Sequence, residues 1–183
     1  IYSQLSLMGF VALGFDPELG VEEHFSKNKA PEDILQLESL ELQLGFLFDQ
    51  PMATQIAVLM DTVTQFDKIE TVASDLVQAW AAGNDKTMAK LIADQNGNSE
   101  LLKEFSKQLL DERNKGMSEK IANYLNTKES YFVIVGAAHL AGPNSIVKLL
   151  EESGLQGERI YSDQLDLQDT PLRNRIKEVS KTP

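Results

Sequence analysis

His139 is the residue of this chain best placed to do chemistry, and it is one of only two histidines. It stands on a turn, because the apolar run Tyr131–Val135 and the small residues Gly136–Ala138 precede it and a helical pattern opens at Gly142. In sheets of parallel strands, ligands gather beyond the carboxyl ends of the strands. We therefore predict that His139 faces a crevice as a general base or a metal ligand. The alternative is a histidine that caps the turn and bonds to a backbone carbonyl.

Arg113 lies at the centre of an apolar stripe, four residues after Leu109 and four before Met117. The stripe consists of Leu102, Phe105, Leu109, Met117, Ile121 and Tyr124, at helical spacing. A charge on a buried face needs a partner, since breaking a buried pair costs roughly 3–5 kcal/mol. We therefore predict a substantially buried Arg113 that pairs with Glu38 or Glu41. The alternative is an arginine that packs only its stem and extends its head to water.

Glu38 and Glu41 are the carboxylates expected near Arg113. They lie in the segment "QLESLELQL", where apolar residues alternate with them. Two carboxylates near a histidine can bind a metal ion or do acid–base work. We predict that both are catalytic, together with His139 and Arg113, and that His139 and Glu41 are metal ligands. The alternative is a solvated helix start, where acidic residues favour the helix dipole.

Two further polar residues complete the candidate set. Glu112 and Asn114 flank Arg113 at about 100° to either side of it on the helix, and we assign them to substrate binding. His24 lies beside Glu22 and Glu23, which indicates a solvated face. The sequence has no Gly-x-Ser-x-Gly elbow, phosphate-binding glycine loop, Gly-x-Gly-x-x-Gly or His-Glu-x-x-His motif. That argues against the common serine hydrolases, nucleotide enzymes and helical zinc proteases.

The spacing of apolar residues predicts the helices and strands that must position these residues. Strands are predicted at Asp33–Glu38, Tyr131–Val135 and Glu158–Ser162. A helix at Pro143–Ser153 would join the last two strands into a β-α-β unit. From about residue 40 to 127 nearly everything has helical period, which predicts an all-helical insertion. The predicted fold is therefore α/β and helix-rich, one domain over residues 1–183 with a small, mainly parallel sheet.

Within the insertion, Ala53–Phe66 and Ile69–Ala82 are predicted as amphipathic helices. Asn84 and Ser99 are predicted caps of the two helices that follow, the second of which would run to about Asn126. Trp80 is expected in the core. The segment "PLRNRIKEV" near the C-terminus reads as one marginal helix.

Composition limits the classes of function. The chain has 183 residues, of which 42% are apolar and 25% charged, and it carries a net charge of −11. This argues against nucleic acid, which needs clustered Lys and Arg, and against anionic lipid. With no cysteine, disulfides and thiol chemistry are excluded. The longest apolar stretch, Leu5–Phe15, is shorter than the roughly 20 residues of a membrane span. We expect this stretch to form a buried helix. The alternative is the apolar part of a signal peptide.

Four segments resemble motifs of the TraB/PrgY/GumN family, which includes the TIKI proteases. "GFDPELGVEEHF" resembles the family's Gly-x-Asp-Pro-Glu-x-Gly-Val-Asp-x-x-Phe segment, and "LESLELQLGFLFD" resembles its Leu-Glu-Thr-x-x-Glu-Gln-x-x-x-x-Asp segment. "DERNKGM" resembles its Glu-Arg-Asn-x-x-Met helix, and "VGAAHLAGPNSIVKLLEESG" resembles its closing Gly-x-x-His segment. The four occur in order over Gly14–Gly154. Two departures are Glu22, where the family has Asp, and Ala138, where it has Gly.

The resemblance implies a metal-dependent hydrolase with a peptidase-like site, a divalent metal such as manganese, cobalt or zinc, and a peptide or small-molecule substrate. It also implies two Gly-x-x-His motifs. The second is Gly136–His139, and the first would precede Ile1, so the chain resembles the C-terminal two-thirds of a family member with an incomplete site. We therefore expect no tightly bound metal and no hydrolase activity in this chain alone. We also expect a homodimer, or the chain's own tail, to cover an exposed sheet edge.

Other interpretations stay open. The resemblance also implies a non-catalytic protein that binds a peptide pheromone or a haem-like ligand. A helical interaction module with a vestigial site is a third interpretation. An exported, periplasmic or membrane-tethered location is suggested by the resemblance alone.

Overall fold

The computed structural model describes residues 2–95 and 99–161, and in these two ranges the regular structure is entirely helical. The α-helices are α1 (Tyr2–Ala12), α2 (Val21–Ser26), α3 (Leu40–Phe48), α4 (Met52–Gln65), α5 (Ile69–Ala81), α6 (Asp85–Asp94), α7 (Glu100–Lys107), α8 (Arg113–Tyr124) and α9 (Ile146–Glu152). Short 3-10 turns are η1 (Pro17–Leu19), η2 (Pro31–Asp33), η3 (Phe66–Lys68) and η5 (Ala137–Leu140), and η4 (Gln108–Glu112) is a π-helical turn.

The predicted α/β fold is wrong for the part of the chain that the structure describes. Tyr131–Val135 and residues 158–161 run as irregular connections, and residues 34–38 follow η2 without forming a strand. Extended chain becomes a strand only when its N–H and C=O groups pair with a neighbouring segment. The backbone of Tyr131–Val135 has no such bond to another described residue. The sheet edge on which the expected homodimer depended is therefore absent from the described ranges; Ser162 and "PLRNRIKEV" lie outside them.

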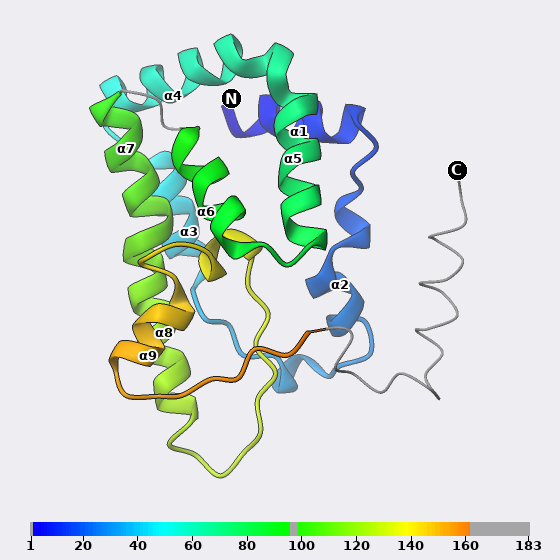
Figure 1. Cartoon of the computed structure of the whole chain (residues 1–183), viewed down its shortest axis with the longest axis vertical. Coiled ribbons are helices and arrows are strands. Elements are labelled where there is room, and N and C mark those ends of the chain that lie inside the picture. The colour runs from blue at the N-terminus through cyan, green and yellow to red at the C-terminus, as the bar shows by residue number, and fades with distance from the viewer. Residues whose placement is uncertain (1, 96–98, 162–183) are drawn as a thin grey trace.

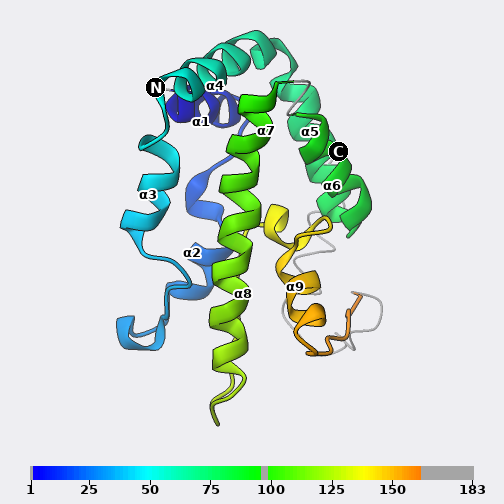
Figure 2. The ribbon, with the colours of Figure 1, turned by 90° about the vertical axis from the view of Figure 1, so that its left-hand side faces the viewer.

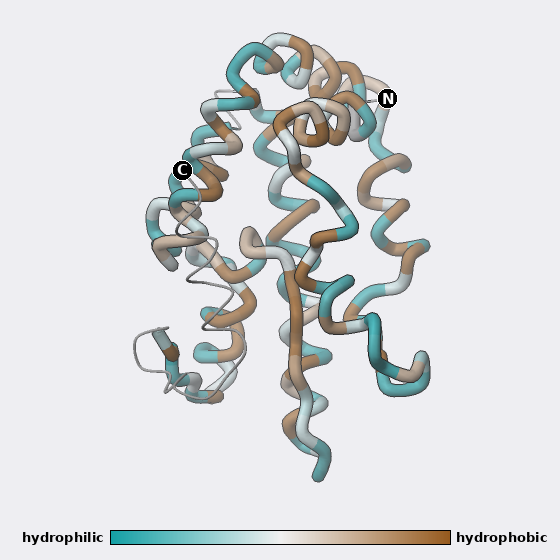
Figure 3. The backbone as a smooth tube through the Cα atoms, turned by 90° about the vertical axis from the view of Figure 1, so that its right-hand side faces the viewer, coloured by the Kyte–Doolittle hydropathy of each residue, from teal (hydrophilic) through white to brown (hydrophobic). Residues whose placement is uncertain are grey.

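The apolar content of Tyr131–Val135 correctly predicted that this segment is not helical. It does not show whether another segment lies alongside to pair with it as a strand. Figure 3 shows this segment as a hydrophobic stretch of the tube. Its side chains are largely exposed, with Phe132 at 72%. The ring of Phe132 lies 4.9 Å from that of Phe25 on α2, centroid to centroid, and the ring of Tyr131 stacks on that of Tyr124 at 4.6 Å. Aromatic contacts, rather than a ladder of hydrogen bonds, hold the segment in place.

The helices predicted from periodicity are present. α4 and α5 begin and end within one residue of the predicted bounds. Asn84 caps α6 by accepting a hydrogen bond from the Thr87 amide at 3.0 Å, and Ser99 caps α7 by accepting one from the Leu102 amide at 3.4 Å. These caps work as expected because a short polar side chain satisfies an amide that has no partner inside the first turn.

The longest feature of the fold is a rod along one side of the molecule. α7, η4 and α8 run end to end as that rod, which faces the viewer in Figure 2. At one end α4 crosses the rod and α1 packs against α4 and α5, while α5 and α6 form a hairpin and α9 packs against α8 (Figure 1). Gly9 lets α1 approach α5, since a Cβ at this position would overlap the side chain of Ile69.

The buried core among the described residues is small. Its apolar members are Val58, Ala73, Ala79, Met88, Phe105, Met117 and Ile146. Trp80 is 60% exposed, so its predicted place in the core is wrong. The Leu5–Phe15 stretch falls largely on α1, where Leu7, Met8 and Val11 are exposed rather than buried. No helix in the described ranges has the length and apolar character needed to cross a membrane.

An open cavity of about 930 Å³ lies inside the arch formed by α1, α4, α5, α6 and α7, and we call it the apolar cavity. Its lining includes Val58, Trp80, Met88, Phe105, Arg113 and Ala138. Arg113 and Ala138 belong to the candidate functional region, so the large cavity adjoins the predicted site.

Candidate functional site

Arg113 and Glu38 form the expected ion pair. The Arg113 Nε atom donates to both carboxylate oxygens of Glu38 at 3.0 Å, and Nη2 donates to Oε2 at 2.7 Å. The Nη1 atom donates to the Leu109 carbonyl at 3.3 Å. The side chain of Glu38 is 3% exposed and that of Arg113 is 18% exposed. The prediction of a largely buried Arg113 paired with Glu38 is confirmed.

The segment that carries Glu38 is anchored to the rod by a second basic residue. The Lys120 Nζ atom donates to the carbonyls of Gln36 and Leu37 at 3.0 and 3.1 Å. Glu38 itself is followed by Ser39, whose hydroxyl caps α3 by accepting from the Leu42 amide. The carboxylate of Glu38 therefore lies in a connection fixed at both ends, although that connection is not the strand predicted from its sequence.

His139 and Asn114 form the second contact of the site. The Nδ1 atom of His139 lies 2.6 Å from Oδ1 of Asn114, and the two residues are 8% and 2% exposed. The Nδ2 atom of Asn114 donates to the carbonyl of Asn144 at 2.7 Å. A carbonyl only accepts hydrogen bonds, so it fixes which end of the Asn114 amide is the donor and turns Oδ1 towards His139.

This chain of hydrogen bonds assigns the tautomer of His139. An amide oxygen only accepts, so Nδ1 of His139 must carry the proton, and in the neutral ring Nε2 carries the lone pair. Nε2 has no hydrogen bond to any other residue in the described ranges. The sequence alternative, a ring bonded to a backbone carbonyl, is not what the structure has.

Burial is the main cause that lowers the pKa of His139 below its ordinary value. The positive charge of Arg113 lowers the pKa further, while the negative charge of Glu38 opposes that effect. The ring is therefore held neutral near pH 7, with Nε2 able to accept a proton or to coordinate an electron-poor centre. We call the two pairs, Arg113–Glu38 and His139–Asn114, the proposed electrostatic unit, because the charges of the first pair act on His139 of the second.

The π-helical turn η4 explains why Asn114 faces inwards. A one-residue widening of the helix rotates everything that follows by about 100° relative to a straight α-helix. Asn114, predicted to lie off the stripe, is consequently fully buried, and both Met117 and Ser118 are buried after it. Arg113 remains close enough to the stripe to reach Glu38. π-helical turns inside α-helices often occur at functional sites.

The loop after His139 supplies the other polar contacts. The side-chain Nδ2 of Asn144 donates to Oδ2 of Asp111 at 2.8 Å, which ties the loop to η4. Gly142 has a φ of 93°, a conformation that side chains with a Cβ rarely adopt. Ser145 is buried and caps α9. Asp111 and Asn144 were not among the predicted site residues, and nothing in their spacing across 33 positions indicates the bond.

A small cavity of about 230 Å³ lies beside these polar groups. It is lined by residues of α6, α7, η4, α8 and the loop, among them Lys103, Asp111, Asn114, Gly142 and Asn144. Ala138 lines both this cavity and the apolar cavity. Ile92, Ser106 and Leu110 also line both, so the two cavities share part of their wall, and that wall includes the residue directly before His139.

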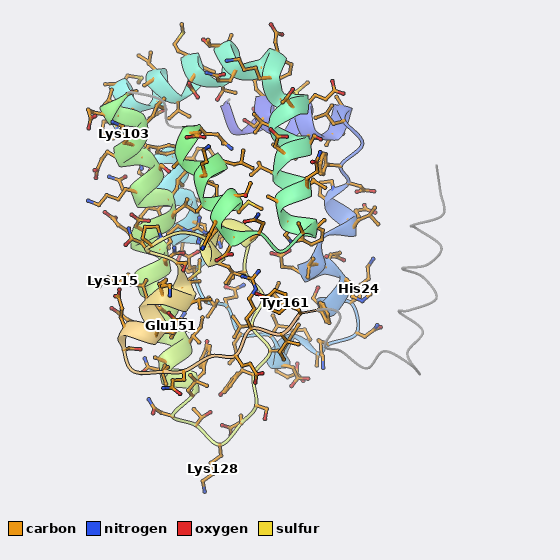
Figure 4. All side chains as sticks on the ribbon, in the orientation of Figure 1. His24, Lys103, Lys115, Lys128, Glu151 and Tyr161 are labelled. Carbon is orange, nitrogen blue, oxygen red and sulfur yellow. The ribbon has the colours of Figure 1, made fainter. Side chains whose placement is uncertain are left out.

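Two predicted residues, Glu41 and Glu112, are not joined to this cluster by any hydrogen bond or ion pair to a described residue, and neither is His24, for which the sequence indicated a solvated face. Glu41, in the first turn of α3, is exposed, and so is Glu112. His24 points outwards from α2 in Figure 4, and its ring contacts Phe25 edge to face at 5.2 Å. Among the residues that the structure describes, no group of three or more His, Cys, Asp or Glu is placed to hold a metal ion.

The sequence model of the TraB/PrgY/gumN family matches residues 1–159. The chain belongs to the TraB/PrgY/gumN family. No curated protein and no solved structure matches the chain significantly. All of the residues that build the cluster of this TraB/PrgY/gumN protein, from Glu38 to Asn144, lie inside the matched range. The family assignment and the buried cluster therefore concern the same part of the chain.

Proposed function

We propose that this TraB/PrgY/gumN protein is a hydrolase with a peptidase-like site, in which His139 acts as the general base through Nε2. The observation that carries the proposal is the hydrogen-bond chain from the Asn144 carbonyl through the Asn114 amide to His139. It keeps the lone pair on Nε2, and burial keeps the ring neutral. A base with these properties takes a proton from water as the water attacks a carbonyl carbon.

Arg113 is proposed to stabilise the negative charge that develops on the carbonyl oxygen. Its guanidinium has five N–H donors, of which Nε–H, one on Nη2 and one on Nη1 are engaged. Two donors remain, one on each terminal nitrogen. Because Glu38 holds the group in one orientation, little reorganisation is needed when charge develops, which is the basis of electrostatic catalysis.

The other candidates take different roles. Glu38 is committed to Arg113, so we assign it to positioning rather than to proton transfer. Asn114 is also reassigned, from substrate binding to orienting His139, because it is 2% exposed. Two roles remain proposals that rest on the sequence alone. They are Glu41 as a catalytic acid or metal ligand and Glu112 as a substrate-binding residue.

Metal dependence is a separate proposal. His139 Nε2 could be one ligand, but tightly held zinc in proteins usually has three or four protein ligands. The described residues offer no such group, so they do not by themselves fit a closed metal site. We therefore assign no catalytic step to a metal. A weakly held divalent cation, manganese, cobalt or zinc, stays a proposal that titration can test.

The test uses the natural gene product that carries this sequence and a mixture of internally quenched peptides as the substrate. His139→Gln should abolish hydrolysis, and Asn114→Ala should lower kcat and move the acidic limb of the pH profile. His24→Gln is the matched control, since His24 is the other histidine and is exposed. Hydrolysis that is unaffected by His139→Gln would contradict the assignment of the base.

A second candidate function is ligand binding without turnover, and the apolar cavity favours it. A cavity of about 930 Å³ lies at the upper end of the roughly 300–1,000 Å³ typical of small-molecule sites. Saturable ligand binding by a natural gene product that hydrolyses no peptide or ester would favour this function over the hydrolase.

A further inference from the structure

The apolar cavity has few polar groups and only two charged ones. The polar and charged residues in its lining are Asp61, Thr62, Gln95, Ser106 and Arg113, and the rest of the lining is apolar or aromatic. In such a cavity, the few polar groups decide which ligand binds and in which orientation. The charge on its wall is therefore the feature that can identify the ligand.

The positive charge of Arg113 is already balanced. Glu38, which is not in the lining, accepts hydrogen bonds from Arg113 at 2.7–3.0 Å. Asp61 is different, since it is half-buried and has no hydrogen bond or ion pair to another described residue. Among the described residues of the lining, Asp61 is therefore the one charged group without a partner.

Asp61 is placed on the face of α4 that borders the cavity. It lies three residues after Val58, which is buried and also lines the cavity. Its neighbour Thr62 turns its hydroxyl back to the Val58 carbonyl at 2.8 Å, so it offers no donor to Asp61. A carboxylate beside apolar surface, with no local donor, favours a positively charged group.

We propose that the apolar cavity binds an aliphatic amine, with the alkyl chain against the apolar wall and the ammonium group on Asp61. The recognition is assigned to Asp61 and not to His139, although Arg113 borders both the cavity and the His139 cluster. The proposal deepens the second candidate function, ligand binding in the cavity, and does not rest on the proposed hydrolase. The overall charge of −11 also favours a cation over a fatty acid of the same length.

Trp80 makes the proposal directly measurable. It is the only tryptophan of the chain, it lies on α5 in the cavity lining, and it is 60% exposed. A ligand chain that covers this ring removes it from water. Saturable binding should therefore shift the tryptophan emission to shorter wavelength.

The experiment titrates the chain with decylamine, decanol and decanoate at low ionic strength, below their aggregation limits. Decylamine should bind at least about tenfold more tightly than the other two, as a charge-assisted hydrogen bond permits. Asp61→Asn should remove that preference while leaving the affinity for decanol unchanged. Asp67→Asn, in η3 and outside the cavity lining, is the matched control and should keep the preference. Far-UV circular dichroism measured alongside should be unchanged, because the ligand fills a space that already exists.

Several results would overturn the proposal. Equal affinities for the three ligands, or a preference for decylamine that survives Asp61→Asn, would show that Asp61 does not recognise the amine. An emission shift that is not saturable, or that accompanies loss of helical signal, would show unfolding rather than binding. A dimer in sedimentation that shields Trp80 before any ligand is added would show that a second copy occupies this face.

Discussion

Replacing Glu38 by Gln tests the charge balance of the site. Glutamine keeps the shape of the side chain and one acceptor oxygen but removes the charge that balances Arg113. Breaking a fully buried pair by removing one partner costs roughly 3–5 kcal/mol. Because the Arg113 side chain is 18% exposed, we expect a somewhat smaller loss of unfolding free energy, about 2–4 kcal/mol.

Urea denaturation followed by circular dichroism measures this loss. Glu41→Gln is the matched control, because Glu41 lies three residues away, is exposed and has no ion pair to a described residue. Its effect should stay within about 0.5 kcal/mol. The double variant Glu38→Leu with Arg113→Met should be much less unstable than the two single changes added together, since no buried charge is left alone. A Glu38→Gln variant no less stable than Glu41→Gln would refute the reasoning.

The same variant has a second consequence that is independent of stability. Glu38 opposes the lowering of the His139 pKa, while Arg113 and burial cause that lowering. Removing the charge of Glu38 should therefore lower the pKa of His139 further. Proton NMR can resolve the two histidines of the chain, and exposed His24 serves as the internal reference. A His139 pKa that rises in Glu38→Gln would contradict the proposed electrostatic unit.

Three further predictions concern pH, metal and the periphery of the fold. The pKa of folded His139 lies below its ordinary value of 6.5, so the neutral ring contributes to the free energy of unfolding above about pH 6.5. That contribution should be lost as the pH decreases. Urea titrations at pH 5 to 7 should show a weaker pH dependence for His139→Gln than for the unchanged chain. Calorimetric titration of this chain with manganese, cobalt and zinc should show no tight stoichiometric binding, and tight binding that His139→Ala removes would contradict this. Arg159 lowers the pKa of Asp85 through a hydrogen bond, but both side chains are about half exposed. Asp85→Asn should therefore lower the free energy of unfolding by less than about 1 kcal/mol in thermal unfolding. A larger loss would show that this contact stabilises the fold.

The parts of the structure that could be predicted from sequence are those fixed by local periodicity. The apolar stripe around Arg113 was sufficient to predict a buried cation and its partner in the "LESLE" segment. Helix caps at Asn84 and Ser99 were readable because each depends on a few consecutive residues. The contacts of Arg113 are long-range, but the requirement for a buried charge to be neutralised made them predictable.

The wrong strand prediction and the missed contact in the site have two different physical causes. The strand at Tyr131–Val135 was assigned from composition, but a strand requires a partner, and composition does not show whether one is present. The contact between Asn114 and His139 was missed because a straight α-helix was assumed. Around Gln108–Glu112 the helix widens, and this change of register, invisible in the apolar pattern, turns Asn114 towards the histidine.

Arg113 lies in the wall of the apolar cavity and also lowers the pKa of His139. Thermodynamic linkage makes these two properties inseparable. Any molecule in the cavity that changes the position or solvation of the guanidinium changes the proton affinity of His139, and protonation of His139 changes the affinity of that molecule by the same factor. A ligand that acts on the guanidinium in this way would couple the cavity to the histidine, and its binding would be accompanied by proton uptake or release.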